Sequence, residues 1–453
     1  MTNGAVALPL DLAELAFTAS GDSLVRRSVL PSGVRILSER VPGARSATIG
    51  YWVAVGSRDE LPATYGSTHF LEHLLFKGTP TRSALDIAVS FDAVGGEHNA
   101  MTAKEYTCYY AKVQDRDLPM AVGVLADMFT SSLIDPAEFE TERAVILEEL
   151  AMADDDPADV ANERFFEAVL GEHPLGRPIG GSPETIRAVS REAVWAHYRA
   201  NYRPQDLVVT VAGAVDHDEL VAAVTAALTT AGWDLSVPAE PVSRRHSGAS
   251  LVDRGSPLVV VKRPIEQANL IVGVPGLAAA DKRRATLSVL NSVFGGGMSS
   301  RLFQEIREKR GLAYSVYSFT PSYSDAGLFG IYAGCSPAKA PQVVELMISE
   351  FARLAGGDVT DEELRRAVGQ LSGASALALE DSDTRMSRLG RSELTLGEFA
   401  DFDESVRRLE LVTAADIRAL AEELVSRPLS LAAVGTVDEK EFAGMATTPA
   451  RTP

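Results

Sequence analysis

The sequence predicts an α+β protein made of two related halves. Its 453 residues are too many for one ordinary hydrophobic core and suit two or more domains. Segments with the spacing of strands and of helices occur in both halves. A pattern that begins at Leu207 returns at Leu429, an offset of 222 residues, which is about half the chain.

The repeated pattern is a strand, a glycine turn and an aspartate that starts a helix. Its two copies are strand 207–212 with Gly213 and Asp216, and strand 429–434 with Gly435 and Asp438. A second correspondence links the strand before Gly56 and the helix ending at Gly78 to strand 269–274 and the helix ending at Gly296. The two halves therefore resemble each other at both ends.

The repeat places the domain boundary near the middle of the chain. We expect an amino-terminal domain at residues 1–232, a linker at 233–256 and a carboxy-terminal domain at 257–453. The linker contains Pro238, Pro241 and several glycines and serines, a composition typical of an exposed connection.

The elements of the first half follow from periodicity and turn residues. Two strands around Gly33 predict a hairpin, and an apolar run predicts a buried strand. The alternation of aromatic and small polar residues after Gly95 predicts two further strands. The predicted strands are 26–30, 34–41, 47–55, two within 95–110, and 207–212. The predicted helices are 83–94, 118–131, 137–153, 160–170 and 191–202.

The second half adds a strand at 328–335 and helices at 340–354 and 361–379. A glycine run at 295–297 precedes a helix, but neither a P-loop lysine nor a complete G-x-G-x-x-G follows, so nucleotide binding is not expected. Cys108 and Cys335 lie far apart and have no metal-binding spacing, so we expect two buried thiols in a reducing compartment.

Charge and composition exclude some classes of function. The formal net charge of −19 argues against nucleic acid as a partner and favours basic or neutral peptides. Residues 1–20 have no basic start, and Asp11 and Glu14 interrupt their apolar character. We therefore expect no signal peptide, no membrane span and a cytoplasmic location.

The motif His69-Phe70-Leu71-Glu72-His73 carries the predicted chemistry. On a helix, His69 and His73 project from one face and can hold a single ion, and Glu72 can take a proton from nearby water. Two histidines on a half-buried helix are the simpler alternative, but chance gives the full H-x-x-E-H pattern in only about 1 in 100 such chains. The corresponding positions of the second half are Leu287, Leu290 and Asn291, so only the first half keeps this chemistry.

A third ligand has to come from another segment, because catalytic zinc usually has three protein ligands. Glu142 and Glu149 are two helical turns apart and share a face of helix 137–153. Helical phase favours Glu149 over its neighbour Glu148, although the sequence leaves both open. A solvated helix face is the alternative for all three glutamates.

His69, Glu72 and His73, followed by Glu149 after 75 residues, resemble the zinc site of the pitrilysin family (M16), whose members include mitochondrial processing peptidase. The resemblance covers nearly the whole chain. It implies two α+β layers, each an antiparallel sheet with packed helices, forming half of a clamshell. It also implies one Zn²⁺ per chain, bound by His69, His73 and Glu149, with Glu142 and Glu105 supporting the ligands.

The same resemblance assigns residues to the substrate. The strand that contains Asn99 and Ala100 corresponds to an open edge onto which an extended peptide is laid. Arg307 and Tyr314, after the glycine run, correspond to a pair that contacts the substrate and stabilises the developing oxyanion. His98 is a less favoured candidate for a further ligand, because a histidine beside a turn is more often exposed and unused.

The function that the resemblance implies is zinc-dependent hydrolysis of peptide bonds in extended peptides or unfolded segments, with Glu72 as the base. A homodimer is expected, because the chain holds both the metal motif and the Arg307/Tyr314 pair. A heterodimer with an inactive relative is the other possibility. The alternative function is a non-catalytic scaffold or partner subunit, which would be expected to have lost metal ligands.

Overall fold

A computed structural model describes residues 4–245, 248, 252–357 and 359–446, which form two compact units. Unit 1 comprises residues 1–150, 178–245 and 376–404, and unit 2 comprises residues 151–177, 246–375 and 405–453. Each unit thus contains one segment from the other half of the chain. The predicted boundaries at 232 and 257 do not include this exchange and stay a prediction.

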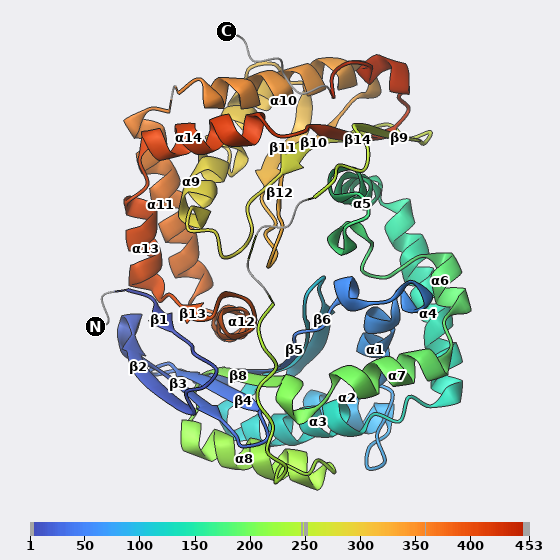
Figure 1. The fold of residues 1–453 in the computed structure, drawn as a ribbon, viewed down its shortest axis with the longest axis vertical. Coiled ribbons are helices and arrows are strands. Elements are labelled where there is room, and N and C mark those ends of the chain that lie inside the picture. The colour runs from blue at the N-terminus through green and yellow to red at the C-terminus, as the bar shows by residue number, and fades with distance from the viewer. Residues whose placement is uncertain (1–3, 246–247, 249–251, 358, 447–453) are drawn as a thin grey trace. The chain divides into compact units, whose positions relative to one another are not determined.

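The sheet of unit 1 has seven strands. Across the sheet they are β2 (Glu14–Ala19), β3 (Ser23–Val29), β4 (Arg35–Arg40), β8 (Leu207–Gly213), β5 (Ser46–Val53), β7 (Thr107–Gln114) and β6 (Glu97–Thr102). β4 and β8 are parallel and the other pairs are antiparallel (Figure 1). The predicted hairpin is confirmed, with Gly33 between β3 and β4 at a φ of 85° that favours glycine.

Helices cover both faces of this sheet. One face, with Ile49 and Tyr51, packs against a core that includes residues of the helices α1 (Ser67–Leu75), α2 (Ala84–Asp92), α3 (Leu118–Ser131), α4 (Pro136–Asp155), α6 (Pro183–Ala188), α7 (Arg191–Asn201) and α8 (His217–Thr230). The other face, with Trp52, packs against α12 (Ser382–Arg391) through Met386 and Leu389. The neighbouring residues Tyr51 and Trp52 thus point to opposite faces, as strand geometry requires.

Unit 2 has a five-stranded sheet and its own core. Across the sheet the strands are β11 (Ala313–Phe319), β12 (Leu328–Cys335), β10 (Ala268–Pro275), β14 (Ser430–Gly435) and β9 (Leu258–Lys262). One face packs against α9 (Arg284–Gly295), α10 (Ala340–Ala355), α11 (Asp361–Ala378) and α14 (Ala414–Val425). The other face packs against α5 (Pro157–Leu170), which comes from the first half of the chain.

The two sheets repeat one topology. In each, a parallel pair, β4 with β8 or β9 with β14, is followed by three antiparallel neighbours that end at an edge strand, β6 or β11. α12 and α5 are the exchanged helices, each lying on the sheet of the other half. The predicted fold class, two related α+β layers of sheet and packed helices, is confirmed. The sheets were expected to be antiparallel, and each instead contains one parallel pair, formed by strands that a helical connection separates in the chain.

Two details of the repeat differ between the halves. Asp216 caps α8 through the amides of Asp218 and Glu219, but Asp438 caps only a short 3₁₀ turn, Glu439–Phe442. α12 was not among the predicted elements. Its buried contacts come from Met386, Leu389 and Gly390 in an otherwise polar segment, so it lacks the apolar stripe that periodicity detects.

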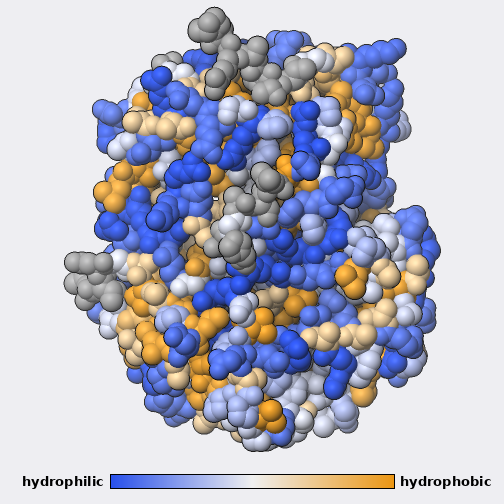
Figure 2. All heavy atoms as spheres, viewed as in Figure 1, coloured by the Kyte–Doolittle hydropathy of each residue, from blue (hydrophilic) through white to orange (hydrophobic). Residues whose placement is uncertain are grey.

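Hydrophilic side chains dominate the molecular face in Figure 2, with hydrophobic ones scattered among them. Among the described residues, no single helix is long and apolar enough to cross a membrane. Two consecutive helical segments, Asp115–Ser131 and Pro136–Asp155, reach the required length and hydropathy only when they are taken together, and the chain bends by 100° between them.

Candidate metal centre

The helix that carries the motif is fixed at its start by a buried carboxylate. The backbone amides of Gly66 and Thr68 donate to the two oxygens of Glu60 at 2.8 and 2.7 Å. Gly66 has a φ of 90°, a conformation that a side chain would strain. Phe70, Leu71, Leu74 and Leu75 are buried in the core of unit 1. The amphipathic pattern of α1 therefore leaves His69 and His73 on the face away from this core.

α4 is held against α1 by aromatic and apolar contacts. Phe139 stacks on Phe70 with ring centroids 4.3 Å apart, and Ile146 is buried in the same core. Because Glu142 and Glu149 are offset from these residues by three on the helix, they lie beside the face that meets α1. The packing of the two helices thus brings a carboxylate to the histidines.

Three ligand atoms meet at one point between these helices. The Nε2 atoms of His69 and His73 lie 3.6 and 3.3 Å from the same Oε2 atom of Glu149. Ligand atoms of the three residues all lie within 4.8 Å of one another. A tetrahedral zinc with bonds of about 2.0–2.1 Å needs ligand atoms about 3.3 Å apart. The donor set and its spacing therefore fit zinc.

Glu142 supports this group without being part of it. The Nδ1–H of His73 donates to Oε2 of Glu142 at 2.9 Å, which leaves Nε2 free to bind a metal. The Nζ atom of Lys77 contacts the other oxygen of Glu142 at 2.6 Å. Glu142 is only 3% exposed, so the contact with Lys77 gives a buried carboxylate a partner of opposite charge.

His69 has a different environment. Its Nδ1 atom is buried and has no hydrogen-bond partner among the described residues. Gly180 lies beside the ring, and a Cβ atom at that position would be 3.6 Å from Nδ1 and 2.9 Å from Leu150. The glycine therefore leaves space next to this histidine.

The electrostatics of the group favour a bound cation. Burial lowers the pKa of His69, but the contact with Glu149 and the charges of Glu149, Glu72 and Glu60 outweigh it, so the pKa is raised above the ordinary value. The contact with His69 in turn lowers the pKa of Glu149. Negative charge thus surrounds the point where the ligand atoms meet.

Glu72 lies next to the group of ligand atoms and is not part of it. It lies one residue before His73 and is partly buried. No hydrogen bond or ion pair of its carboxylate is found in the described part of the chain, and its charge acts on His69. A carboxylate side chain in such a position is a candidate proton acceptor.

The other predicted residues of unit 1 have individual environments. Glu148 is exposed and does not belong to the group of ligands, so the helical phase that favoured Glu149 agrees with the geometry. The carboxylate of Glu105 pairs with Arg58 at 2.5 Å. His98 stacks on Phe91, with ring centroids 4.4 Å apart, and burial lowers its pKa. The support that Glu105 was expected to give to a ligand histidine stays a prediction.

Asn99 and Ala100 lie on β6, which within the described residues pairs on one side only, with β7. The Oδ1 atom of Asn99 accepts from the amide of Ala100 at 2.8 Å. An edge strand offers unpaired backbone groups along one side, which is the arrangement that a peptide could extend.

Arg307 and Tyr314 form a local unit within unit 2. The Nη1 atom of Arg307 donates to the carbonyl of Tyr314 at 2.9 Å. Its guanidinium lies 4.6 Å from the ring centroids of both Phe303 and Tyr314. The pairing of β11 shifts register between Ala313 and Ser315, and the Tyr314 side chain is 76% exposed. Arg307 thus contacts Tyr314, the Tyr314 side chain is accessible, and the role of the pair toward a substrate stays a prediction.

Lys77, Glu60 and Gly180 were not predicted as parts of the site. Lys77 is four residues after His73, in the turn that follows α1, and this helical spacing could have pointed to it. Glu60 and Gly180 belong to loops, and no periodicity relates them to the motif. Only the folded chain brings them to α1.

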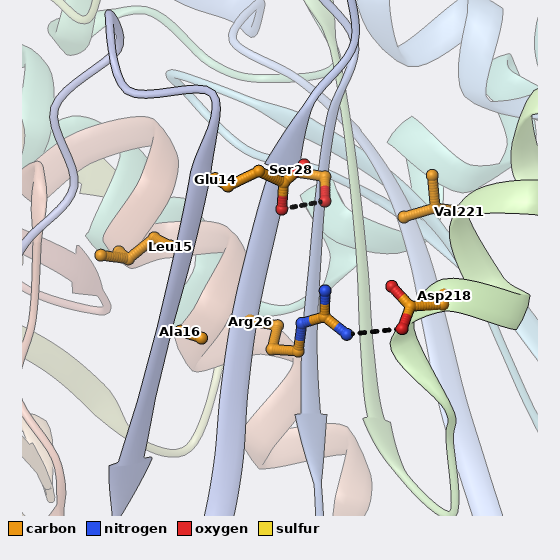
Figure 3. A pocket seen from close by; sticks show the side chains of 7 residues that line it. All are labelled: Glu14, Leu15, Ala16, Arg26, Ser28, Asp218 and Val221. Carbon is orange, nitrogen blue, oxygen red and sulfur yellow. Dashed lines mark hydrogen bonds and ion pairs between the residues drawn. The ribbon is translucent and has the colours of Figure 1, made fainter.

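A separate open cavity of about 500 Å³ lies at the other edge of the unit 1 sheet (Figure 3). Arg26 in it pairs with Asp218 at 2.9 Å, and Ser28 donates to Glu14 at 2.8 Å. None of the predicted site residues lines this cavity. Its charged groups satisfy one another, so we do not assign it to the candidate site.

The fold and the three converging ligands define an α+β protein of two repeated units with a candidate zinc site in the first. Residues 35–182 match the family described as Insulinase (Peptidase family M16), and residues 188–371 match the domain described as Peptidase M16 inactive domain. The chain belongs to peptidase family M16.

Related proteins agree with this assignment. The chain is 49% identical to an uncharacterised zinc protease of Streptomyces coelicolor, over 93% of this chain and 92% of that protein. It is 39% identical to the uncharacterised zinc protease YmxG of Bacillus subtilis, over 91% and 98% of the two chains. A crystal structure of a protease from Helicobacter pylori has the same fold, with a TM-score of 0.81 and 21% identity over 92% of this chain and all of that one.

Proposed function

We propose that this protein is a zinc-dependent endopeptidase whose metal is held by His69, His73 and Glu149. The observation that carries the proposal is the convergence of two imidazole Nε2 atoms on one carboxylate oxygen at 3.6 and 3.3 Å. The names of relatives that are 39–49% identical over most of the chain point to the same metal and reaction class.

In this proposal, each residue of the site has a different role in hydrolysis. Zinc in this site supplies a Lewis acid, which polarises a peptide carbonyl and makes water more acidic. The carboxylate of Glu72 takes the proton from the attacking water and passes it to the leaving amine. Glu142 orients His73 through its Nδ1–H, and Lys77 holds Glu142 in place.

We further propose that the substrate is an extended peptide or an unfolded segment. The one-sided pairing of β6 supports this, because an extended chain could add to the edge at Asn99 and Ala100 through backbone hydrogen bonds. In this proposal, Tyr314 donates to the carbonyl oxygen as it becomes an oxyanion, and Arg307 binds a backbone carbonyl or a carboxylate. The net charge of −19 favours basic or neutral peptides.

The proposed assembly is a homodimer, and the proposed location is the cytoplasm. A homodimer needs no second type of chain, because this chain holds both the metal ligands and the Arg307/Tyr314 pair. Light scattering of the purified protein, alone and mixed with any co-purifying relative, tests the first proposal.

The experiment that tests the function combines metal analysis with cleavage of a quenched fluorescent peptide. We expect about one zinc per chain in the wild type and in Glu72→Gln, and cleavage by the wild type only. The conservative change removes a proton acceptor and keeps the shape of the side chain. If neither protein binds zinc or cuts the peptide, the chain is a scaffold, and the proposal is wrong.

A further inference from the structure

Three arginine side chains meet one glutamate in the interior of unit 1. Glu393 is fully buried in a short π-helix, Ser392–Leu396, that the second half of the chain contributes to this unit. The Nη1 atoms of Arg27 on β3 and Arg35 on β4 each lie 3.4 Å from one of its oxygens. The Nη2 atom of Arg244 lies 3.0 Å from Oε1.

The charges in this cluster do not balance. Guanidinium groups keep their charge in proteins, so three positive groups face a single carboxylate. Both contacts from Arg27 and Arg35 are long, since charge-assisted hydrogen bonds usually measure about 2.7–2.9 Å. Arg27 and Arg35 are each only 1% exposed, so water outside the protein does not screen the excess charge. Burial, followed by the charges of Arg244 and Arg27, lowers the pKa of Arg35.

Several donors of the cluster are also unpaired. Arg27 donates through Nη2 to the carbonyls of Pro9 and Leu12 at 2.5 and 2.6 Å, and Arg244 donates to the carbonyl of Leu8 at 2.7 Å. Within the described residues, however, Nε of Arg27 and both Nε and Nη2 of Arg35 have no acceptor. Buried donors of charged groups are rarely left without one.

We propose that Arg27 and Arg35 bind a small monovalent inorganic anion, of the chloride type, inside unit 1. An anion accepts the unpaired N–H groups and also offsets the excess positive charge, whereas a water molecule would do only the first. The near-complete burial of Arg27, Arg35 and Glu393 favours a small inorganic ion over an organic or phosphorylated ligand. The ion thus binds arginines of two strands, β3 and β4. The same arginine cluster also contacts the segment near Pro9, Arg244 and the π-helix that carries Glu393.

Such an ion binds only the folded protein and must therefore stabilise it by mass action. We expect thermal unfolding of the full chain to shift upward by about 2–4 °C when chloride or bromide replaces gluconate at constant ionic strength. The shift should saturate as the halide concentration rises. A shift that grows linearly, or none at all, would overturn the proposal, because salts acting on the whole surface do not saturate.

Diffraction from crystals grown in bromide locates the ion directly. We expect one anomalous peak within about 3.5 Å of Nε and Nη2 of Arg35. Density for an ordered water at that position, with no anomalous signal, would show that the donors are satisfied without an anion. This measurement uses the wild-type chain and does not depend on the folding of any variant.

Matched variants separate the site from general salt effects. Arg35→Met should lose the saturable halide dependence, whereas Arg26→Met should keep it, since Arg26 on the same hairpin pairs with Asp218 at the surface. Circular dichroism reports whether each variant is folded. An Arg35→Met protein that is folded and still shows the saturable shift would contradict the assignment.

Discussion

At the scale of single residues, the metal centre depends on side chains that position other side chains. The sequence predicts His69 and His73 as ligands because they are four apart on a helix. Glu149 could be chosen only by helical phase and by the resemblance to a family, because its distance to the histidines depends on how α4 packs on α1. Lys77 was missed because it contacts Glu142, which in turn binds His73, and no pattern in the motif predicts this indirect contact.

Lys77 provides a test at this scale. Lys77→Met should weaken zinc binding about 10–100-fold, because Glu142 would lose its charge partner and hold His73 less firmly. Lys77→Arg should retain most of the affinity. Competition with a metal chelator measures the difference. Lys112→Met is the matched control, since Lys112 makes an exposed ion pair with Asp381. Equal affinity of all four proteins would exclude this role of Lys77.

At the scale of elements, periodicity predicted those helices and strands that bury a regular apolar face. α3 and β12 begin and end at the predicted residues. α12 was missed because it contacts the sheet through only a methionine, a leucine and a glycine. At Gly390 the helix backbone lies close to the sheet, and a Cβ atom there would be 2.5 Å from the Trp52 ring. α11 begins at the predicted residue, Asp361, where Thr360 and Glu363 exchange hydrogen bonds between backbone and side chain, and Arg301 pairs with Glu363 at 2.8 Å.

This ion pair makes the stability of unit 2 depend on pH. Burial raises the pKa of Glu363, but the bonds from Arg301 and Thr360 outweigh it and lower the pKa from 4.5 to about 2. A carboxyl with a lowered pKa in the folded state stabilises above its unfolded pKa, and this contribution is lost as the pH falls toward 2. Chemical unfolding should show Glu363→Gln to be less stable than the wild type at pH 6, with a smaller difference at pH 3.5.

The control for this prediction is Glu362→Gln on the same turn of helix. Glu362 pairs with Arg365 at the surface, so its replacement should have little effect at either pH. A difference between wild type and Glu363→Gln that stays constant, or increases, as the pH falls would contradict the account of the Arg301–Glu363 pair.

At the scale of the whole molecule, the repeat predicted two similar layers but not the exchange of helices between them. An offset of 222 residues relates the strands of the two sheets. This offset cannot show that α5, from the first half of the chain, belongs to unit 2, or that α12, from the second half, belongs to unit 1. The spacing of the repeat would be the same whichever sheet each helix covered. Family membership follows from the comparisons, whereas the substrate, the assembly and the location stay proposals.

The exchange predicts how fragments of the chain behave. Residues 1–245 alone lack α12, so Trp52, Cys108 and Val208 would lose the cover of Met386 and Leu389. We expect this fragment to bind a hydrophobic dye and to be digested rapidly by protease. Adding a peptide of residues 376–404 should protect it. A fragment 1–245 that unfolds cooperatively and resists protease by itself would contradict the importance of the exchanged helix.

Anomalous diffraction at the zinc edge, from crystals of the purified protein, shows directly whether His69, His73 and Glu149 bind zinc. We expect one peak per chain, about 2.0–2.2 Å from Nε2 of His69, Nε2 of His73 and an oxygen of Glu149. No peak at that point in zinc-supplemented crystals, or a zinc bound elsewhere with Glu149 outside bonding distance, would contradict it.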